Sequence, residues 1–294
     1  MKVAIVGFGV MGRQIAQVFA QHGNNVTVTD DNERALHVGL DEIVNGPYGI
    51  RKAVARGKMT DEEGSRAIRA IKTSSSLEEA CSDADIIVEA VFENANLKKR
   101  VLGQIDMTAP SGAIIASNTS TLGLTKISSG VEKKERVVGM HFFNPAQITK
   151  LVEIIKSDYT SDGTVREASR IAERLGKTPI VALDQPGFIA NRLGLALYIE
   201  ASRLLEEGTA TVRDIDLAMK LGYNHPMGPF ETADLVGLDT RMRNLEALFQ
   251  QTHEERWLPP KTLRELVNEG YLGDPARRTG SKGGYYTRFP SETR

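Results

Sequence analysis

The sequence predicts an α/β protein in which a doubly wound sheet is followed by an all-helical C-terminal domain. Three observations lead to this prediction. Short β-branched runs alternate with longer helical patterns in the first half of the chain, strand signals stop after residue 184, and a glycine-rich turn follows the first run. The length of 294 residues is sufficient for two domains, which we place at residues 1–184 and 185–294.

Seven runs rich in β-branched residues are expected to form one large sheet. They lie at residues 3–6, 25–29, 85–88, 112–115, 137–140, 151–155 and 179–182. Several of these runs are apolar at nearly every position, which is typical of parallel strands covered by helices on both faces. We therefore expect the first domain to be doubly wound.

A charged insert with few strand signals, at about residues 32–82, separates the second run from the third, and we expect it to be helical. It contains four cations within eight residues, Arg51, Lys52, Arg56 and Lys58, which we call the cationic patch. Such a patch is either a solvated helix face or a surface that meets phosphates.

The C-terminal domain begins at the turn Pro186-Gly187. Beyond it, apolar residues recur at helical spacing over residues 188–206, 212–221, 235–249 and 258–268. The first of these segments is apolar on more than one face, which predicts that it forms the core of the domain or a contact between subunits.

The composition excludes several classes of protein. The 37 Lys and Arg residues nearly balance 38 Asp and Glu residues, so no strong field attracts nucleic acid or an anionic membrane. No apolar run approaches the roughly 18 residues of a membrane span. The single cysteine, Cys81, excludes an internal disulfide, and no spacing indicates a metal site. We expect a cytoplasmic protein that binds neither nucleic acid nor membranes.

Residues 7–12 form the motif GxGxxG between the first expected strand and the first expected helix. Gly7 permits a tight turn, Gly9 lets the backbone approach a pyrophosphate, and Gly12 lets the helix pack closely on the strand. A helical pattern opens at Met11 and runs to Ala20, and the free N–H groups at its start would face the phosphates. Val10 and Met11 are therefore also candidates for cofactor binding. This context predicts a Rossmann-like dinucleotide site.

Asp30 stands directly after the second run, 18 residues after Gly12. Its carboxylate would accept hydrogen bonds from the ribose hydroxyls and repel a 2′-phosphate, and Asp31 would add to that repulsion. The sequence therefore favours NAD over NADP as the cofactor. The alternative is a structural glycine turn in which Asp30 caps a helix.

A second candidate site begins at His141, which follows the fifth run and starts the block His-Phe-Phe-Asn-Pro. Ligands of doubly wound sheets bind at this carboxyl edge. Glu153 lies inside the apolar run 151–155, where a carboxylate without a partner would be costly to bury. An imidazole would be a suitable partner, because the carboxylate would fix its tautomer and raise the basicity of its other nitrogen. We predict a His141–Glu153 dyad; the alternative is a structural histidine.

Several ordered motifs resemble those of the L-3-hydroxyacyl-CoA dehydrogenase family, in particular its short, stand-alone 3-hydroxybutyryl-CoA dehydrogenases. Besides the glycine turn, the motifs are Glu-Ala-Val-Phe-Glu at 89–93, Ser-Asn-Thr-Ser-Thr-Leu at 117–122, the block at 141–145, Pro-Gly-Phe-Ile-Ala-Asn-Arg at 186–192 and His-Pro-Met-Gly-Pro at 225–229. The block at 141–145 is the most specific, because related sugar-acid dehydrogenases tend to lack its paired phenylalanines.

The resemblance implies a reversible, NAD-dependent oxidation of an (S)-3-hydroxyacyl-CoA to the 3-ketoacyl-CoA. His141 would take the hydroxyl proton while a hydride passes to the nicotinamide, and Glu153 would stabilise the resulting imidazolium. Ser120 and Asn191 would bind the substrate oxygen, and Ser120 would also contact the cofactor. Asn144 would lie near the nicotinamide.

The resemblance also implies further binding residues. Glu93 and Lys98 match positions that flank the nicotinamide ribose, although the sequence alone suggests only an acid at a helix start and an exposed lysine. In the family, the corresponding insert meets the coenzyme A phosphates, which makes the cationic patch a candidate for that role. Near the C terminus, Arg278 stands where the family usually has a lysine, so either Arg278 or Lys282 could approach the cofactor.

Two other functions are consistent with the sequence. The protein could oxidise a free hydroxy acid, such as a sugar acid or a carnitine-like compound, if the cationic patch does not recognise coenzyme A. It could also bind NAD without catalysis. The presence of all four candidate catalytic residues argues against this; they are His141, Glu153, Ser120 and Asn191. The family further implies a homodimer formed through the helical domains. The acyl chain length and the direction of the reaction are left open.

Overall fold

The structure, a computed structural model, describes residues 1–290. The chain divides into two compact units, Met1–Phe188 and the residues from Ile189 onward. The first unit is a Rossmann-like α/β domain and the second is helical, as the sequence predicts.

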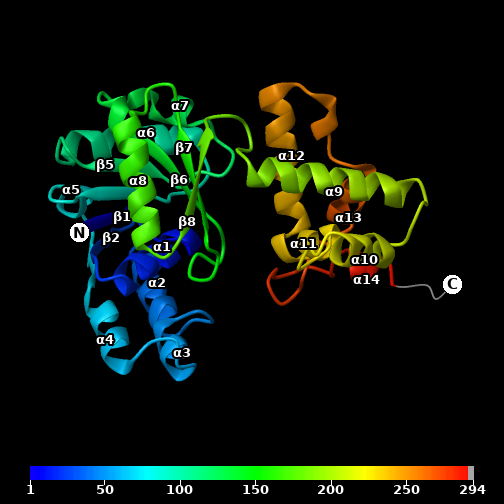
Figure 1. The fold of residues 1–294 in the computed structure, drawn as a ribbon, viewed down its shortest axis with the longest axis horizontal. Coiled ribbons are helices and arrows are strands. Elements are labelled where there is room, and N and C mark those ends of the chain that lie inside the picture. Colours follow the sequence, from blue (N-terminus) through cyan, green and yellow to red (C-terminus); the bar gives the residue numbers. More distant parts are fainter. Residues whose placement is uncertain (291–294) are drawn as a thin grey trace. The chain divides into compact units, whose positions relative to one another are not determined.

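The first unit contains an eight-stranded sheet with the order β3-β2-β1-β4-β5-β6-β7-β8 (Figure 1). The strands are β1 (Lys2–Val6), β2 (Asn25–Thr29), β3 (Ile71–Ser74), β4 (Ile86–Glu89), β5 (Ile114–Ser117), β6 (Val137–Phe142), β7 (Leu151–Lys156) and β8 (Thr178–Leu183). The order changes direction between β1 and β4, and such a switch point is where ligands of doubly wound sheets bind.

The sheet differs from the prediction in two respects. β3 lies in the insert that was expected to be only helical, and it forms an edge strand paired with β2. Lys72 and Thr73 are exposed at this edge, and the sequence Ile-Lys-Thr-Ser has a single large apolar residue. The strand therefore lacks the apolar run that identified the others. The second difference is that β7 runs antiparallel to β6, and β8 follows the direction of β7. Residues 143–150 are too few for the crossover that a parallel pair requires.

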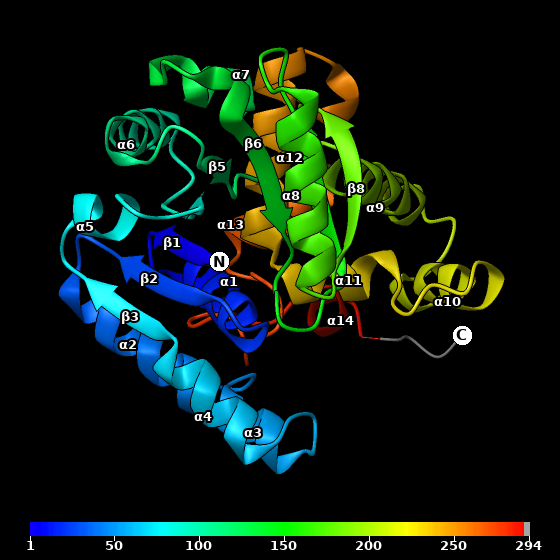
Figure 2. The same cartoon turned by 60° about the vertical axis from the view of Figure 1, so that its left-hand side comes forward.

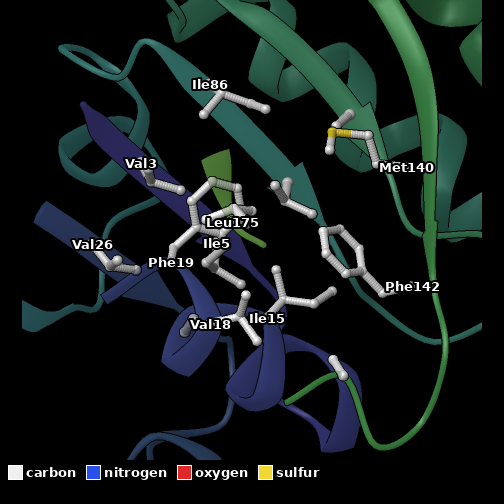
Figure 3. Packing of buried hydrophobic residues seen from close by; sticks show 14 of the residues in the cluster. Val3, Ile5, Ile15, Val18, Phe19, Val26, Ile86, Met140, Phe142 and Leu175 are labelled. Atoms are coloured by element: carbon white, nitrogen blue, oxygen red, sulfur yellow. The ribbon is translucent and has the colours of Figure 1, made fainter. Parts of the chain in front are cut away.

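Helices cover both faces of this sheet. One face packs against α1 (Val10–Gln21), α2 (Glu33–Asn45) and α8 (Asp162–Arg174), and the other against α5 (Leu77–Cys81), α6 (Ala95–Thr108) and α7 (Leu124–Ile127). Alternate residues of β1 enter opposite cores, as the pleat requires. Figure 3 shows Val3 and Ile5 of β1 with Ile15, Val18 and Phe19 of α1 in the first of these cores.

The insert consists of α2, α3 (Ile50–Ala55) and α4 (Asp61–Arg69), followed by β3 and α5. In Figure 2, α4 and α3 extend beyond the start of β3. Side chains next to the N-termini of several helices in this unit cap the free N–H groups of the first turn. The Asn32 side chain accepts from the Arg34 N–H at 3.0 Å, Thr60 and Glu63 form a capping box at α4, and Asn94 caps α6.

The second unit has six α-helices and one short 3-10 helix, Glu255–Trp257, among its described residues. The α-helices are α9 (Ala190–Glu206), α10 (Val212–Gly222), α11 (Pro229–Val236), α12 (Leu238–Thr252), α13 (Lys261–Asn268) and α14 (Tyr285–Arg288). Their core contains Tyr198, Phe230, Trp257 and Tyr285, and the hydroxyls of Tyr198 and Tyr285 lie 2.6 Å apart. One isolated β-bridge, between Gly273 and Gly283, departs from the all-helical prediction.

Helix α11 was not predicted, although its start carries two recognisable signals. Pro229 occupies the first turn, and the Glu231 carboxylate accepts from the Gly228 N–H at 3.0 Å. The helix has only eight residues, and Gly237 separates it from α12, so its apolar pattern is too short to stand out.

Within residues 1–290, no helix combines the length and the apolar character needed to cross a lipid bilayer. The cytoplasmic location stays a prediction.

The close pairing of β6 and β7 gives a stability prediction. Gly139 lies opposite Ile155, and a methyl group added at Gly139 would lie 2.6 Å from the Ile155 Cβ. We expect Gly139→Ala to lower the free energy of unfolding by roughly 1–3 kcal/mol, because the neighbouring strands would have to separate. Urea unfolding followed by circular dichroism measures this change.

Gly112→Ala is the matched control, because no atom lies within 4 Å of a methyl group added there. Equal stabilities of the two variants would contradict the close packing inferred for Gly139.

Candidate active site

The glycine turn joins β1 to α1 at the switch point of the sheet. Gly7 adopts a φ of +94°, and its N–H donates to the Thr29 carbonyl at 2.8 Å. A methyl group added at Gly12 would lie 1.9 Å from the Gly7 carbonyl oxygen, so only glycine allows α1 to begin so close to β1. Both positions therefore require glycine for the turn itself.

Gly9 has a different environment, because no atom lies within 4 Å of a methyl group added there. It is the N-cap residue of α1 and makes no side-chain cap, and Val10 and Met11 follow in the first turn. Their N–H groups precede the first intrahelical hydrogen bond, from the Arg13 N–H to the Gly9 carbonyl. The open space beside this helix start fits a pyrophosphate.

Asp30 lies directly beside the glycine turn. Its two carboxylate oxygens accept from the Phe8 N–H at 2.7 Å and from the Asn32 N–H at 2.9 Å. These bonds hold a negative charge next to the helix start, and Asp31 is exposed beside it. This arrangement fits a cofactor with free ribose hydroxyls, such as NAD, and disfavours a 2′-phosphate.

His141 and Glu153 are direct partners across the antiparallel β6–β7 pair. Glu153 Oε2 lies 2.7 Å from His141 Nδ1, and the Glu153 side chain is completely buried. An ionised carboxylate can only accept, so opposite ionised Glu153 the imidazole would donate from Nδ1, and Nε2 would be its second nitrogen. The ring centroids of Phe143 and Phe188 lie 4.4 Å and 5.8 Å from the centroid of the imidazole ring, so its surroundings are largely apolar.

Glu93, in the segment between β4 and α6, organises the loop that follows β5. Its Oε1 accepts from the Thr119 hydroxyl at 2.7 Å, the Ser120 N–H at 2.8 Å and the Thr121 N–H at 3.0 Å. Burial would raise the pKa of Glu93, but Lys98 and these donors outweigh it, so the pKa lies below its ordinary value. The carboxylate thus fixes the backbone that carries Ser120.

Lys98 is completely buried, and the expectation of an exposed lysine is wrong. Its ammonium group lies 2.7 Å from Glu89 Oε1 and 3.5 Å from Glu93 Oε2. The other oxygen of Glu89 accepts from the Ser117 hydroxyl at 2.5 Å. Lys98 therefore connects two carboxylates, and its contribution to a cofactor site would act through Glu93.

Glu89 is a residue of this site that the sequence analysis did not single out. It is a fully buried carboxylate at the end of the apolar strand β4. The same signal, an acid inside an apolar run, identified Glu153 and could have identified Glu89.

The remaining candidates are found in three places. Asn144 follows β6, and its Oδ1 accepts from the Gln14 side chain at 3.0 Å. The cationic patch is exposed on α3 and the turn that follows, with Arg51 donating to the Asn45 side chain at 2.9 Å. Asn191 belongs to the second unit, in the first turn of α9.

Arg278 and Lys282 make contacts within the second unit. The Arg278 guanidinium lies 3.0 Å from Asp239 and also donates to the Val236 carbonyl, and Lys282 donates to the Glu269 carbonyl at 2.8 Å.

The lowered pKa of Glu93 predicts a pH-dependent effect on stability. Since the folded-state pKa lies below the ordinary 4.5, the carboxylate stabilises the folded state above about pH 4.5, and this contribution is lost as the pH falls through the folded-state pKa. We expect Glu93→Gln to lower the free energy of unfolding at neutral pH, and the difference from wild type to shrink in acid. Urea unfolding over a pH series measures it; a difference independent of pH would contradict the ionised role.

Comparison with known proteins identifies the family of this chain. The family model described as "3-hydroxyacyl-CoA dehydrogenase, NAD binding domain" matches residues 2–185, and that of the C-terminal domain of the same family matches residues 187–283. A probable 3-hydroxyacyl-CoA dehydrogenase of Caenorhabditis elegans is 41% identical over 97% of this chain and 95% of its own length. A probable 3-hydroxybutyryl-CoA dehydrogenase of Bacillus subtilis is 38% identical over 94% of this chain and 95% of its own.

Among solved structures, the (S)-3-hydroxybutyryl-CoA dehydrogenase of Ralstonia eutropha is similar over the whole fold. It is 37% identical, has a TM-score of 0.89, and the match covers 96% of this chain and 98% of that protein. The matches to both domain models and the near full-length relatives point to one conclusion. The chain belongs to the 3-hydroxyacyl-CoA dehydrogenase family of NAD-dependent oxidoreductases.

Proposed function

We propose that the protein interconverts short-chain (S)-3-hydroxyacyl-CoA and 3-ketoacyl-CoA thioesters, with His141 and Glu153 as the acid–base pair. The observation that carries this proposal is the 2.7 Å contact between His141 Nδ1 and the buried carboxylate of Glu153. A histidine held in this way has one nitrogen fixed by a carboxylate and the other available for a proton.

In the oxidative direction, His141 Nε2 takes the proton of the substrate hydroxyl, and the carbon–hydrogen bond at C3 breaks as the carbonyl forms. NAD, when bound at the glycine turn and Asp30, supplies the hydride acceptor for this step. Glu153 stabilises the imidazolium that results, because it is a buried negative charge in direct contact with Nδ1. In the reductive direction, the imidazolium returns the proton to the substrate oxygen.

Ser120 and Asn191 bind the reacting oxygen in this proposal, and Asn144 contacts the nicotinamide. Support for the position of Ser120 comes from Glu93 Oε1, which accepts from its backbone N–H at 2.8 Å and from its hydroxyl at 3.2 Å. The roles of Asn191 and Asn144 follow from the resemblance of their motifs to those of the family.

The relatives support a short acyl chain, since those of Bacillus subtilis and Ralstonia eutropha are named 3-hydroxybutyryl-CoA dehydrogenases. We assign the cationic patch to the coenzyme A phosphates, because its side chains are exposed and concentrated on one short helix and the turn after it.

We also propose that the protein is a homodimer. Leu193 in α9 is 68% exposed, and Ala196 of the same helix is exposed as well, so this helix presents apolar side chains that a second subunit could cover. Sedimentation analysis would establish the oligomeric state.

The substrate class is tested by following NADH absorbance after addition of acetoacetyl-CoA, with free acetoacetate at equal concentration in a parallel sample. We expect rapid oxidation of NADH with the thioester and none with the free acid, because the cationic patch should recognise coenzyme A. Equal rates with both would indicate a free hydroxy acid as the substrate. An inactive protein would favour a sugar acid or a non-catalytic role in NAD binding.

The acid–base pair is tested by His141→Gln and Glu153→Gln. We expect His141→Gln to lower kcat by about 10²–10⁴-fold while NADH binding persists, because glutamine cannot transfer the proton. Glu153→Gln should lower the rate and shift its pH dependence, because a neutral amide stabilises the imidazolium less. His22→Gln, at the end of α1, is the control. A His141→Gln variant that retains most of its activity would refute the mechanism.

A further inference from the structure

Gln14 connects helix α1 to the segment that follows β6. It is 9% exposed and makes two hydrogen bonds to residues more than 120 positions away. Its Oε1 accepts from the Ala146 N–H at 2.7 Å, and its Nε2 donates to Asn144 Oδ1 at 3.0 Å. Gln14 follows the glycine turn by two residues, so this helix carries both the candidate phosphate site and the contact to Asn144.

The chemistry of these contacts fixes the orientation of both side-chain amides. A backbone N–H can only donate, so the atom of Gln14 that faces Ala146 must be its oxygen. The amide nitrogen of Gln14 therefore faces Asn144 and needs an acceptor there. Asn144 must present Oδ1 to Gln14, which directs its own NH₂ group elsewhere.

Further contacts hold the same segment in place. The Gln147 side chain donates to Gln17, also in α1, at 2.9 Å, and the Lys177 ammonium donates to the Ala146 carbonyl at 2.5 Å. The segment is thus fastened to α1 at two positions, while Gln14 is the residue that determines which end of the Asn144 amide faces away from the helix.

We propose that Gln14 is a positioning residue that presents the NH₂ group of Asn144 as a hydrogen-bond donor to an oxygen of the nicotinamide nucleoside. This inference rests on the proposed function, which places Asn144 at the nicotinamide. In this arrangement, helix α1 determines both where the pyrophosphate binds and which group Asn144 offers to the nicotinamide nucleoside.

Gln14→Glu separates this role from simple support of the fold. A carboxylate still accepts from the Ala146 N–H, and its second oxygen can accept from Asn144 once that amide has turned over. Both local hydrogen bonds persist, but Asn144 then offers Oδ1 to the cofactor in place of its NH₂ group. We expect the affinity for NADH to fall by about tenfold, the size of one lost hydrogen bond.

Isothermal titration calorimetry with NADH and with ADP provides the readout, because ADP lacks the nicotinamide and its ribose. We expect Gln14→Glu to weaken NADH binding and to leave ADP binding and the urea unfolding midpoint unchanged. Gln21→Glu adds the same charge to α1 about two turns away and is the control. An equal loss of affinity for NADH and ADP, or no loss for NADH, would overturn the proposal.

Asn144→Ala completes the test. If Gln14 acts through Asn144, Asn144→Ala should weaken NADH binding by itself, and Gln14→Glu should add no further loss in that background. Additive losses, or normal NADH binding by Asn144→Ala, would refute the inference. Neither binding measurement requires turnover, so a protein that fails to reduce acetoacetyl-CoA but shows these binding patterns would refute the proposed substrate alone.

Discussion

Burial of a carboxylate inside an apolar strand is the constraint on which the candidate active site depends. Such a group is costly unless a cation or hydrogen-bond donors meet it, and the first unit contains two of them, Glu153 in β7 and Glu89 in β4. Glu153 meets His141 across the β6–β7 pair, and Glu89 meets Lys98 from α6. Each carboxylate thereby determines the position of a candidate site residue at the carboxyl edge of the sheet.

The two partners differ in what they can do. Lys98 lies between Glu89 and Glu93, and Glu93 in turn accepts from the backbone N–H of Ser120. These contacts hold the loop that carries Ser120 in place. An imidazole can change its protonation state near neutral pH, which suits His141 to the proton transfer that we propose. Family membership accords with this division, because a dehydrogenase of an alcohol needs both an acid–base group and a fixed site for its cofactor.

Helix α1 connects the two halves of the site. Its first turn borders the open space at Gly9, and Gln14 and Gln17 reach the segment that begins at Asn144. A shift of this helix relative to the sheet would therefore move the candidate phosphate site and the candidate nicotinamide contact together. The close approach of Gly12 to the Gly7 carbonyl opposes such a shift, because helix and strand are in direct backbone contact.

Local patterns in the sequence were enough to predict the apolar strands, the helical second domain, the glycine turn and the position of Asp30 after the second strand. The sequence did not reveal β3, whose exposed edge leaves a single large apolar residue, or the reversed direction of β7 and β8. It also did not reveal the burial of Lys98 or the hydrogen bonds of Gln14, which appear only in the folded chain. Periodicity shows which side of a helix or strand is buried, because it depends on neighbouring residues. A buried polar side chain instead needs a hydrogen-bond or charge partner, and that partner often lies far away in the chain.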